Sequence, residues 1–316
     1  MLRYALNRIL TLIPVIFLVS VGAFSFLHLL PGDVIDVLAG EEDIEDPEVR
    51  AALEKEFGLD KPIYIQYLVW AGRISRGNFG KSYVTRRPIA KELFERFPAT
   101  IYLALAGITI AMVIAIPLGT IAGIRRNTFI DYISQTTSLF GISIPEFWFA
   151  IMCILFFSLY LGWLPSSEYY SPFEDLGKSL KHLILPAAAI GFRQAAFTTR
   201  LTRSSMLDES SKEYVDTARS LGLPERKVIY KYTLRNALIP TVTIGGLQLV
   251  ALLGGTVVIE TIFAWPGIGL AIYESIQTRD FPLLQAGILM LSVITVSVNL
   301  LVDLLYRVLN PRVRLT

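Results

Sequence analysis

The chain has 316 residues, of which 53% are hydrophobic and 18% are charged, and its formal net charge is +2. Its length alone allows two soluble domains, but a mean hydropathy of +0.54 means that the average side chain favours an apolar solvent. So small a net charge indicates no nucleic-acid partner. The single cysteine, Cys153, excludes an internal disulfide and a cysteine-based metal site.

Apolar runs long enough to cross a bilayer recur along the chain. A spanning helix needs about 20 apolar residues, because each residue advances it by about 1.5 Å. Backbone groups inside lipid find no water, so each run must be helical. We therefore expect an all-α, polytopic membrane protein with six transmembrane helices. The expected spans are 9–30, 99–124, 132–163, 183–199, 236–259 and 281–302.

The distribution of Lys and Arg predicts the orientation. Fifteen of these side chains lie in the segments 1–8, 125–131, 200–235 and 306–316, and three lie in the short loops 164–182 and 260–280. Cation-rich loops stay in the cytoplasm, so we expect both termini there. The first run also has features of a cleaved secretory signal, but it is too long for one and no small-residue cleavage pattern follows.

Three regions follow from this topology. They are 1–30, with the N-terminus and first span; 31–98, a small helical extracytoplasmic cap; and 99–316, the core with spans two to six. Helices are expected in the cap over 47–57 and 63–74, and an interfacial helix over 88–97 is expected to precede the second span. The cap is interpreted either as a docking surface or as a lid over helix ends.

Polar residues inside the spans are candidates for the translocation pathway. Glu146 and Arg193 are the only charges well inside, where a charge costs from about 2.5 kcal/mol upward. They line the pathway, pair with each other, or snorkel to an interface. Gln248 is a third pathway candidate or a hydrogen-bonded joint between helices. Glu260 begins an aromatic outer loop that is either an interfacial anchor or an outer gate.

A charged, helix-forming segment connects the fourth and fifth spans and reads EYVDTARSLGLPERKVIYKYTLRNALIP. Val215, Ala218 and Leu221 recur at helical spacing, which predicts a short amphipathic helix. Gly222 permits the backbone reversal that ends this helix, and Pro224 begins the next one. The sequence therefore predicts a helix-turn-helix lever, within 207–235, held by two membrane helices.

Part of this lever, DTARSLG, resembles the EAA motif of the membrane subunits of bacterial ATP-binding-cassette importers. Asp216 stands for the usual glutamate, Thr217 and Ala218 for the two small residues, and Gly222 for the glycine. The usual continuation, Ile-x-Leu-Pro, is matched only at Leu234. The stretch LRNALIP that begins there is instead typical of the dipeptide, oligopeptide and nickel permeases.

The resemblance to that branch extends over nearly the whole chain and is closest to its B-type permease subunit. The stretches that carry it are MLRYALNRIL at 1–10, PGD at 31–33, GLDKPIYIQY at 58–67, GNFGKS at 77–82, RFPAT at 96–100, SIPEFW at 143–148, LTRSSMLD at 201–208, ETIFAWPGIG at 260–269 and RDFPLLQ at 279–285.

The resemblance implies a set of partners in the bacterial inner (cytoplasmic) membrane. They are a second homologous permease in a heterodimer, two cytoplasmic ATPases and an extracytoplasmic substrate-binding protein. The chain has no Gly-x-x-x-x-Gly-Lys-Ser/Thr phosphate loop, so we expect no enzyme activity and no cofactor here, with ATP and Mg bound by the ATPases. The implied ATPase-coupling residues are Asp216, Thr217, Ala218, Arg219, Gly222 and Leu223.

The substrate and the class of transporter leave alternatives. Di- and oligopeptides are expected first, with nickel chelates or glutathione as alternatives in the same architecture. An ion-coupled secondary transporter is the other transport class, although no internal repeat is visible. A membrane-embedded enzyme needs a cluster of His, Asp or Glu, whereas His28 and His182 stand apart in the sequence.

Overall fold

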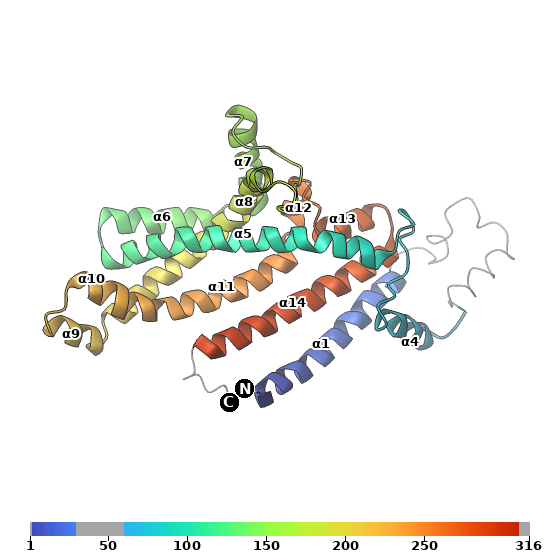
Figure 1. Cartoon of the computed structure of the whole chain (residues 1–316), viewed down its shortest axis with the longest axis horizontal. Coiled ribbons are helices and arrows are strands. Elements are labelled where there is room, and N and C mark those ends of the chain that lie inside the picture. Colours follow the sequence, from blue (N-terminus) through green and yellow to red (C-terminus); the bar gives the residue numbers. More distant parts are fainter. Residues whose placement is uncertain (1, 30–59, 310–316) are drawn as a thin grey trace. The chain divides into compact units, whose positions relative to one another are not determined.

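The computed structural model describes residues 2–29 and 60–309, whose regular secondary structure is helical apart from one isolated bridge between Lys81 and Pro88. The prediction of an all-α fold is confirmed for these residues. In chain order (Figure 1) the helices are α1 (Leu2–Leu29), α4 (Ile63–Ile74), α5 (Ile89–Ile124), α6 (Phe129–Ser143), α7 (Glu146–Cys153), the π-helix η1 (Ile154–Tyr160), α8 (Leu176–Ser210), α9 (Glu213–Ser220), α10 (Glu225–Lys227), the π-helix η2 (Val228–Leu234), α11 (Arg235–Gly255), α12 (Val257–Ile262), α13 (Ile268–Gln277) and α14 (Phe281–Leu309).

Several of these helices have the length and composition of membrane spans. Among the described residues three qualify alone: α5, the Glu225–Gly255 helix that contains α11, and the Phe281–Leu304 part of α14. The helices α6 and α7–η1 qualify together but are bent by 103° where they meet. The bend lies at Ile144, whose backbone is extended because a residue before proline avoids the helical region. The run expected at 132–163 is therefore a broken helix.

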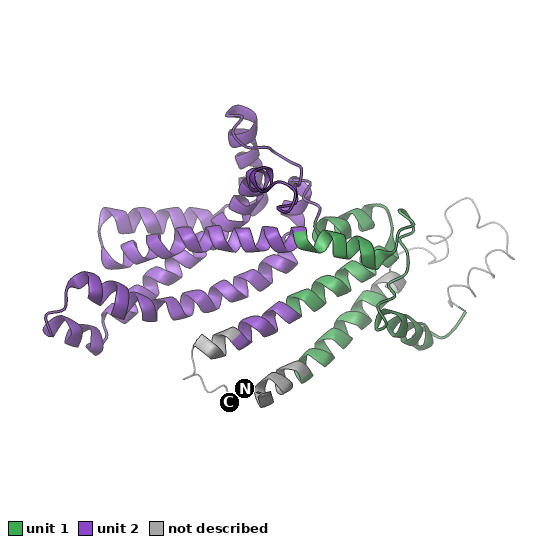
Figure 2. Cartoon of the chain, viewed as in Figure 1, with its two compact units in different colours: residues 1–98, 267–296 green, residues 99–266, 297–316 purple. Residues whose placement is uncertain are grey.

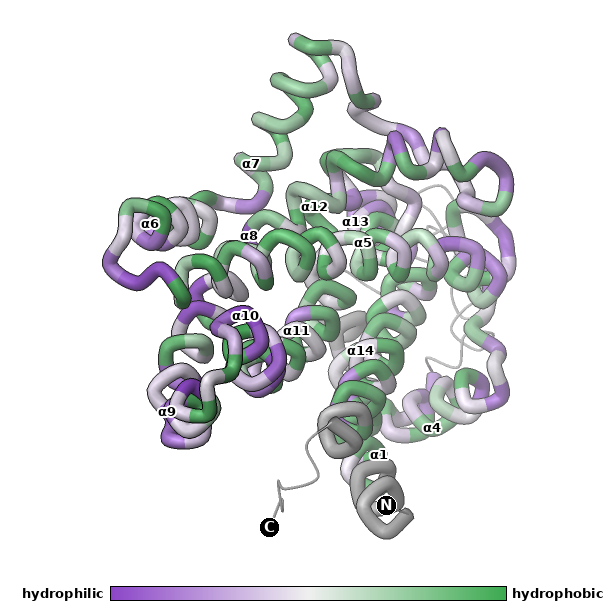
Figure 3. The backbone as a smooth tube through the Cα atoms, turned by 60° about the vertical axis from the view of Figure 1, so that its left-hand side comes forward, coloured by the Kyte–Doolittle hydropathy of each residue, from purple (hydrophilic) through white to green (hydrophobic). Residues whose placement is uncertain are grey.

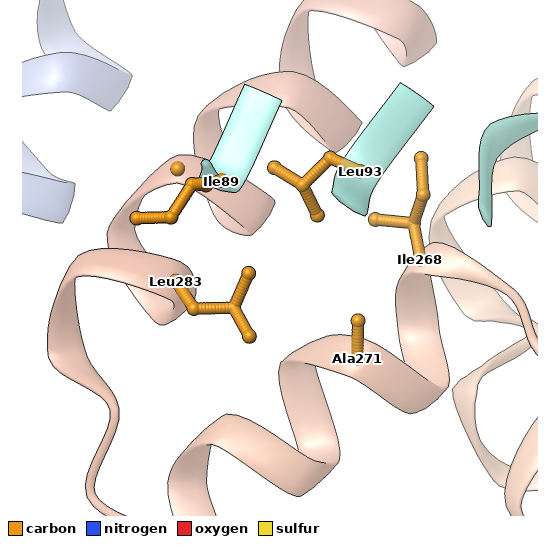
Figure 4. Packing of buried hydrophobic residues seen from close by; sticks show 6 residues of the cluster. Ile89, Leu93, Ile268, Ala271 and Leu283 are labelled. Atoms are coloured by element: carbon orange, nitrogen blue, oxygen red, sulfur yellow. The ribbon is translucent and has the colours of Figure 1, made fainter. Parts of the chain in front are cut away.

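The chain divides into two compact units (Figure 2), of which the first comprises residues 1–98 and 267–296. Its core is apolar. Side chains from the start of α5, from α13 and from α14 converge there (Figure 4): Ile89, Leu93, Ile268, Ala271 and Leu283. Beside them the buried Asp280 accepts hydrogen bonds from the Ser82 hydroxyl and, at 3.4 Å, from the Leu283 amide.

Two of the helices predicted in the cap region are confirmed. The helix expected at 63–74 is confirmed as α4, and its Tyr67 hydroxyl lies 2.8 Å from that of Ser20 on α1. The helix expected over 88–97 is confirmed as the start of α5, which begins at Ile89 and continues through Pro98 into the second expected span. Its Ile89 and Leu93 side chains are buried in the core of the first unit, and its position along the membrane interface stays a prediction. The helix expected at 47–57 lies outside the described residues.

The second unit, residues 99–266 and 297–316, is built around α8. This helix packs against α6, α7 and α11. Glycines permit close approach: a Cβ on Gly141 of α6 would lie 2.6 Å from that of Ala196, and one on Gly119 of α5 would lie 2.7 Å from that of Thr202. Small residues at helix contacts let backbones approach, as in other membrane bundles. These contacts hold α8 between its neighbours.

Candidate coupling site

The segment between α8 and α11 forms a helix-turn-helix, as the sequence predicts. Helix α9 ends at a turn in which Gly222 has φ +72°, a left-handed conformation that side chains other than glycine seldom adopt. The Gly222 amide donates to Arg219 O at 2.9 Å and the Leu223 amide to Ala218 O at 3.4 Å. Pro224 then precedes α10, which continues through η2 into α11 without a break. Figure 3 shows hydrophilic residues on both α9 and α10.

An apolar cluster holds α9 against η2. Val215, Ala218 and Val228 are at most 5% exposed, and Tyr214 and Leu223 pack against them. The small side chain of Ala218 therefore packs within this chain and is not available to contact a partner. Gly222 differs, because a Cβ placed there would meet nothing within 4 Å. Its requirement for glycine comes from the backbone angle.

The other predicted coupling residues lie on the outer surface of the turn. The side chains of Asp216 and Arg219 are 69% and 41% exposed, and Thr217 is exposed beside them. Arg219 contacts Asp216 at 3.3 Å and Glu225 at 3.2 Å. The hydrogen bond to Glu225, opposed by desolvation and assisted by Asp216, raises the pKa of Arg219. The turn thus presents a paired cation with acids on both sides.

Leu221 is the residue of this site that the sequence analysis assigned wrongly. Helical spacing predicts that it shares the buried stripe of Val215 and Ala218, yet its side chain is 75% exposed. The helix ends at Ser220, so the 3.6-residue periodicity no longer fixes the direction of the next side chain. Leu221 therefore lies on the surface of the turn, next to the exposed charged groups of α9.

A buried ion pair in the second unit was missed by the sequence analysis. Asp131, in the first turn of α6, is fully buried and accepts from Arg203 of α8 at 2.5 and 2.8 Å. The Asn127 amide and the Gln135 side chain complete its hydrogen bonds at 3.0 and 3.1 Å. The two partners are far apart in the sequence and no local spacing signals them. The pair fixes the start of α6 to α8.

The predicted pathway residues are only partly brought together. Glu146 is half-buried at the start of α7, and Arg193 is exposed on α8, the helix against which α7 packs. Gln248 is buried instead against α8, where its side-chain oxygen accepts from Thr198 at 3.1 Å. The hydroxyls of Thr202 and Thr241, 3.2 Å apart, continue this polar contact between α8 and α11.

A cavity of about 230 Å³ lies among α5, α6 and α8 of the second unit. It is mainly apolar, and Glu146, Arg193 and Gln248 are not among its lining residues. The part of the chain that the structure describes contains no group of three or more His, Cys, Asp and Glu arranged to hold a metal ion. The helix-turn-helix is therefore the candidate site that the structure defines in most detail.

Glu260 is packed inside the second unit, at the start of the aromatic loop that the sequence analysis interprets as an interfacial anchor or an outer gate. Its carboxylate accepts from the hydroxyls of Thr100 at 3.0 Å and Thr256 at 2.9 Å, and it is fully buried. The indole of Trp265, also buried, donates to the carbonyl of Ala99 at 2.8 Å. These contacts fix the loop after α12 to α5.

Two family models cover the chain. "Binding-protein-dependent transport system inner membrane component" matches residues 115–315, and "Binding-prot-dependent transport system membrane comp, N-term" matches residues 1–104. The chain belongs to this family. The predicted resemblance is confirmed: it is a B-type permease subunit of an ATP-binding-cassette importer. Such permeases have no ATPase domain of their own.

Relatives match this permease over its whole length. The glutathione transport system permease protein GsiC of Escherichia coli (strain K12) is 41% identical, with 99% of both chains covered. The dipeptide transport system permease protein DppB of Alkalihalophilus pseudofirmus is 39% identical, with 99% of this chain and 100% of the relative covered. A solved structure of the MetNI methionine ABC transporter, 17% identical, matches with a TM-score of 0.57 over 71% of this chain and 98% of the other. This likeness shows a shared fold.

Proposed function

We propose that this permease forms, with a second homologous subunit, the membrane pathway of a bacterial importer of short peptides. The observation that carries the proposal is the full-length match to relatives named for dipeptide and glutathione transport. Glutathione is itself a tripeptide, so both names point to one substrate class. Peptides are the proposed substrates, and glutathione is the second candidate because 41% identity to a glutathione permease favours it.

The proposed topology has six spans in the bacterial cytoplasmic membrane, with both termini in the cytoplasm. The excess of Lys and Arg in segments such as 200–235 supports this orientation. It places the helix-turn-helix on the side of the membrane where ATP is present. It also places the cap outside, where a substrate-binding protein would deliver its ligand.

The coupling surface in this proposal is the exposed set Asp216, Thr217, Arg219, Leu221 and Gly222, called here the coupling tip. Leu221 would enter an apolar depression on a partner ATPase, while the charges of Asp216 and Arg219 would pair with charges around it. Ala218 and Leu223 would act indirectly, because they pack α9 in place. ATP and Mg would bind the ATPase, and this chain would hold no cofactor.

The proposed pathway residues are Glu146 and Arg193, since their opposite charges suit the two charged ends of a zwitterionic peptide. Gln248 is proposed to contribute through the polar contact between α8 and α11 that it forms with Thr198. Movement of the coupling tip would displace these two helices, which both connect to it, and so change access to the pathway.

Reconstitution tests the proposed function. The permease is placed in liposomes with the second permease, the ATPases and the binding protein encoded beside it. Uptake of a labelled dipeptide, glutathione and a nickel chelate is measured with ATP inside the liposomes. We expect peptide uptake that requires ATP and the binding protein. Uptake driven by an ion gradient without ATP would refute the importer mechanism, and uptake of the chelate alone would refute the substrate class.

A further inference from the structure

The connection between α8 and α9 is not a continuous helix. Lys212 has φ −82° and ψ 143°, an extended conformation that interrupts the backbone hydrogen bonds between the two helices. At the other end of α9, the turn at residues 221–224 separates it from α10, which continues through η2 into α11. The backbone thus joins α9 to both α8 and α11 through short non-helical links, so side-chain contacts are needed to fix its orientation.

The side chain of Tyr214 connects α9 to both α8 and α11. The Tyr214 hydroxyl, on the first turn of α9, donates to the Glu209 carboxylate of α8 at 2.6 Å. It accepts from the Asn236 side-chain amide of α11 at 3.0 Å, and the same amide reaches the Tyr232 carbonyl at 3.0 Å. A phenol has one proton to donate and lone pairs to accept, so a single hydroxyl makes both bonds.

The charges around this hydroxyl favour the arrangement. Lys212 binds the other oxygen of the Glu209 carboxylate. Burial raises the pKa of Glu209, but the hydrogen bonds from Lys212 and Tyr214 outweigh it and leave that pKa below its ordinary value. Burial and the bond to Glu209 raise the pKa of Tyr214, so its hydroxyl keeps its proton. A hydrogen bond to an ionised acceptor is stronger than one between neutral groups.

The apolar cluster beneath α9 cannot replace these bonds. Val215, Ala218 and Val228 give a small buried contact between α9 and η2 that includes no residue of α8. Hydrogen bonds prescribe both distance and angle. The Tyr214 hydroxyl is thus the directional contact that fixes how α9 lies against α8.

We propose that Tyr214 is a positioning residue whose hydroxyl transmits the movement of α9 to α8 and α11 together. The inference rests on the proposed coupling role of α9, but it assigns the transmission to a residue outside the coupling tip. Without the hydroxyl, an ATPase would still bind the tip, but the movement of α9 would lose the directional contact that moves α8 and α11 in step.

The test uses the complete reconstituted transporter with Tyr214→Phe, which removes one oxygen and keeps the packed ring. We expect the ATPases to co-purify as with the wild type, and the substrate transported per ATP hydrolysed to fall roughly tenfold, because losing a hydrogen bond to a charged group shifts the equilibrium between the fixed and displaced positions of α9 by about that factor. Tyr230→Phe is the matched control, because that ring is 60% exposed on η2. It should transport normally.

Two further variants leave the tyrosine in place and so keep the test valid if Tyr214→Phe folds poorly. Glu209→Gln retains an oxygen that accepts from Tyr214, and we expect it to keep most of the transport per ATP. Glu209→Ala removes the acceptor and should behave as Tyr214→Phe does. Equal behaviour of the glutamine and alanine variants would contradict the proposed role of the hydroxyl.

A spectroscopic readout separates transmission from general destabilisation. In a Cys153→Ser background, which removes the only cysteine, spin labels are placed at Arg200 on α8 and Ser220 on α9. Tyr214→Phe should broaden the distribution of distances between the labels. An unchanged distribution together with unchanged transport per ATP would overturn this inference alone. Failure of the wild-type chain to bind any ATPase would overturn the proposed function.

Discussion

Leu221 gives a test of the coupling tip whose size follows from the structure. Full burial of a leucine side chain is worth about 1.5–3 kcal/mol. Three-quarters of this side chain is exposed, so docking can gain about 1–2 kcal/mol from it. Truncation to alanine should remove most of that gain. We therefore expect Leu221→Ala to weaken ATPase binding roughly tenfold.

The assay is a titration of the ATPase subunit onto the permease pair in lipid nanodiscs without nucleotide. The second permease should carry its own tip, so the titration should show one weakened and one unchanged site. Leu221→Met should bind normally, because it conserves volume and apolar character. The matched control is Leu176→Ala, a leucine 61% exposed at the other end of α8. It should leave both sites unchanged.

An unchanged dissociation constant for Leu221→Ala would show that the leucine is not at the contact and would refute the assignment of the tip. A loss of binding by Leu176→Ala as well would show that the assay reports general damage to the bundle. Thermal unfolding of each variant complements the titration, because an exposed side chain should contribute little to stability.

Three other changes have expected outcomes. Gly222→Val should reduce transport per ATP more than Gly222→Asn, because a left-handed backbone costs most residues about 1–2 kcal/mol and asparagine tolerates it better. Equal losses of transport in the two variants would mean that the backbone angle is irrelevant. Asp131→Asn should lower the melting temperature of the purified complex, because it leaves Arg203 without its counter-charge at a cost of about 3–5 kcal/mol. The double variant Asp131→Asn with Arg203→Gln should recover part of the lost stability. Glu260→Ala should lower the melting temperature of the complex more than Glu260→Gln, because alanine offers no acceptor to the Thr100 and Thr256 hydroxyls. Each hydroxyl left without an acceptor costs about 1–3 kcal/mol. Equal melting temperatures for the two variants would contradict this role of Glu260.

Most of the lever was predictable from the sequence. Gly222 and Pro224 have backbone properties that act locally, so the turn and the start of the next helix follow from residue type alone. The direction of Leu221 was not predictable, because it depends on where α9 ends. The role of Tyr214 was equally hidden, because its partners Glu209 and Asn236 lie on other helices.

The helical class of this protein was determined by its sequence, since apolar runs in lipid must satisfy their backbone hydrogen bonds within each segment. Which side chains meet was decided by the tertiary structure alone. Asp131 meets Arg203 across 72 positions and Glu260 meets Thr100 across 160. Hydropathy and periodicity report the face of a helix that is apolar, but they carry no information about the helix that packs against it. The burial of Asp131, Glu260 and Ala218 follows from that packing.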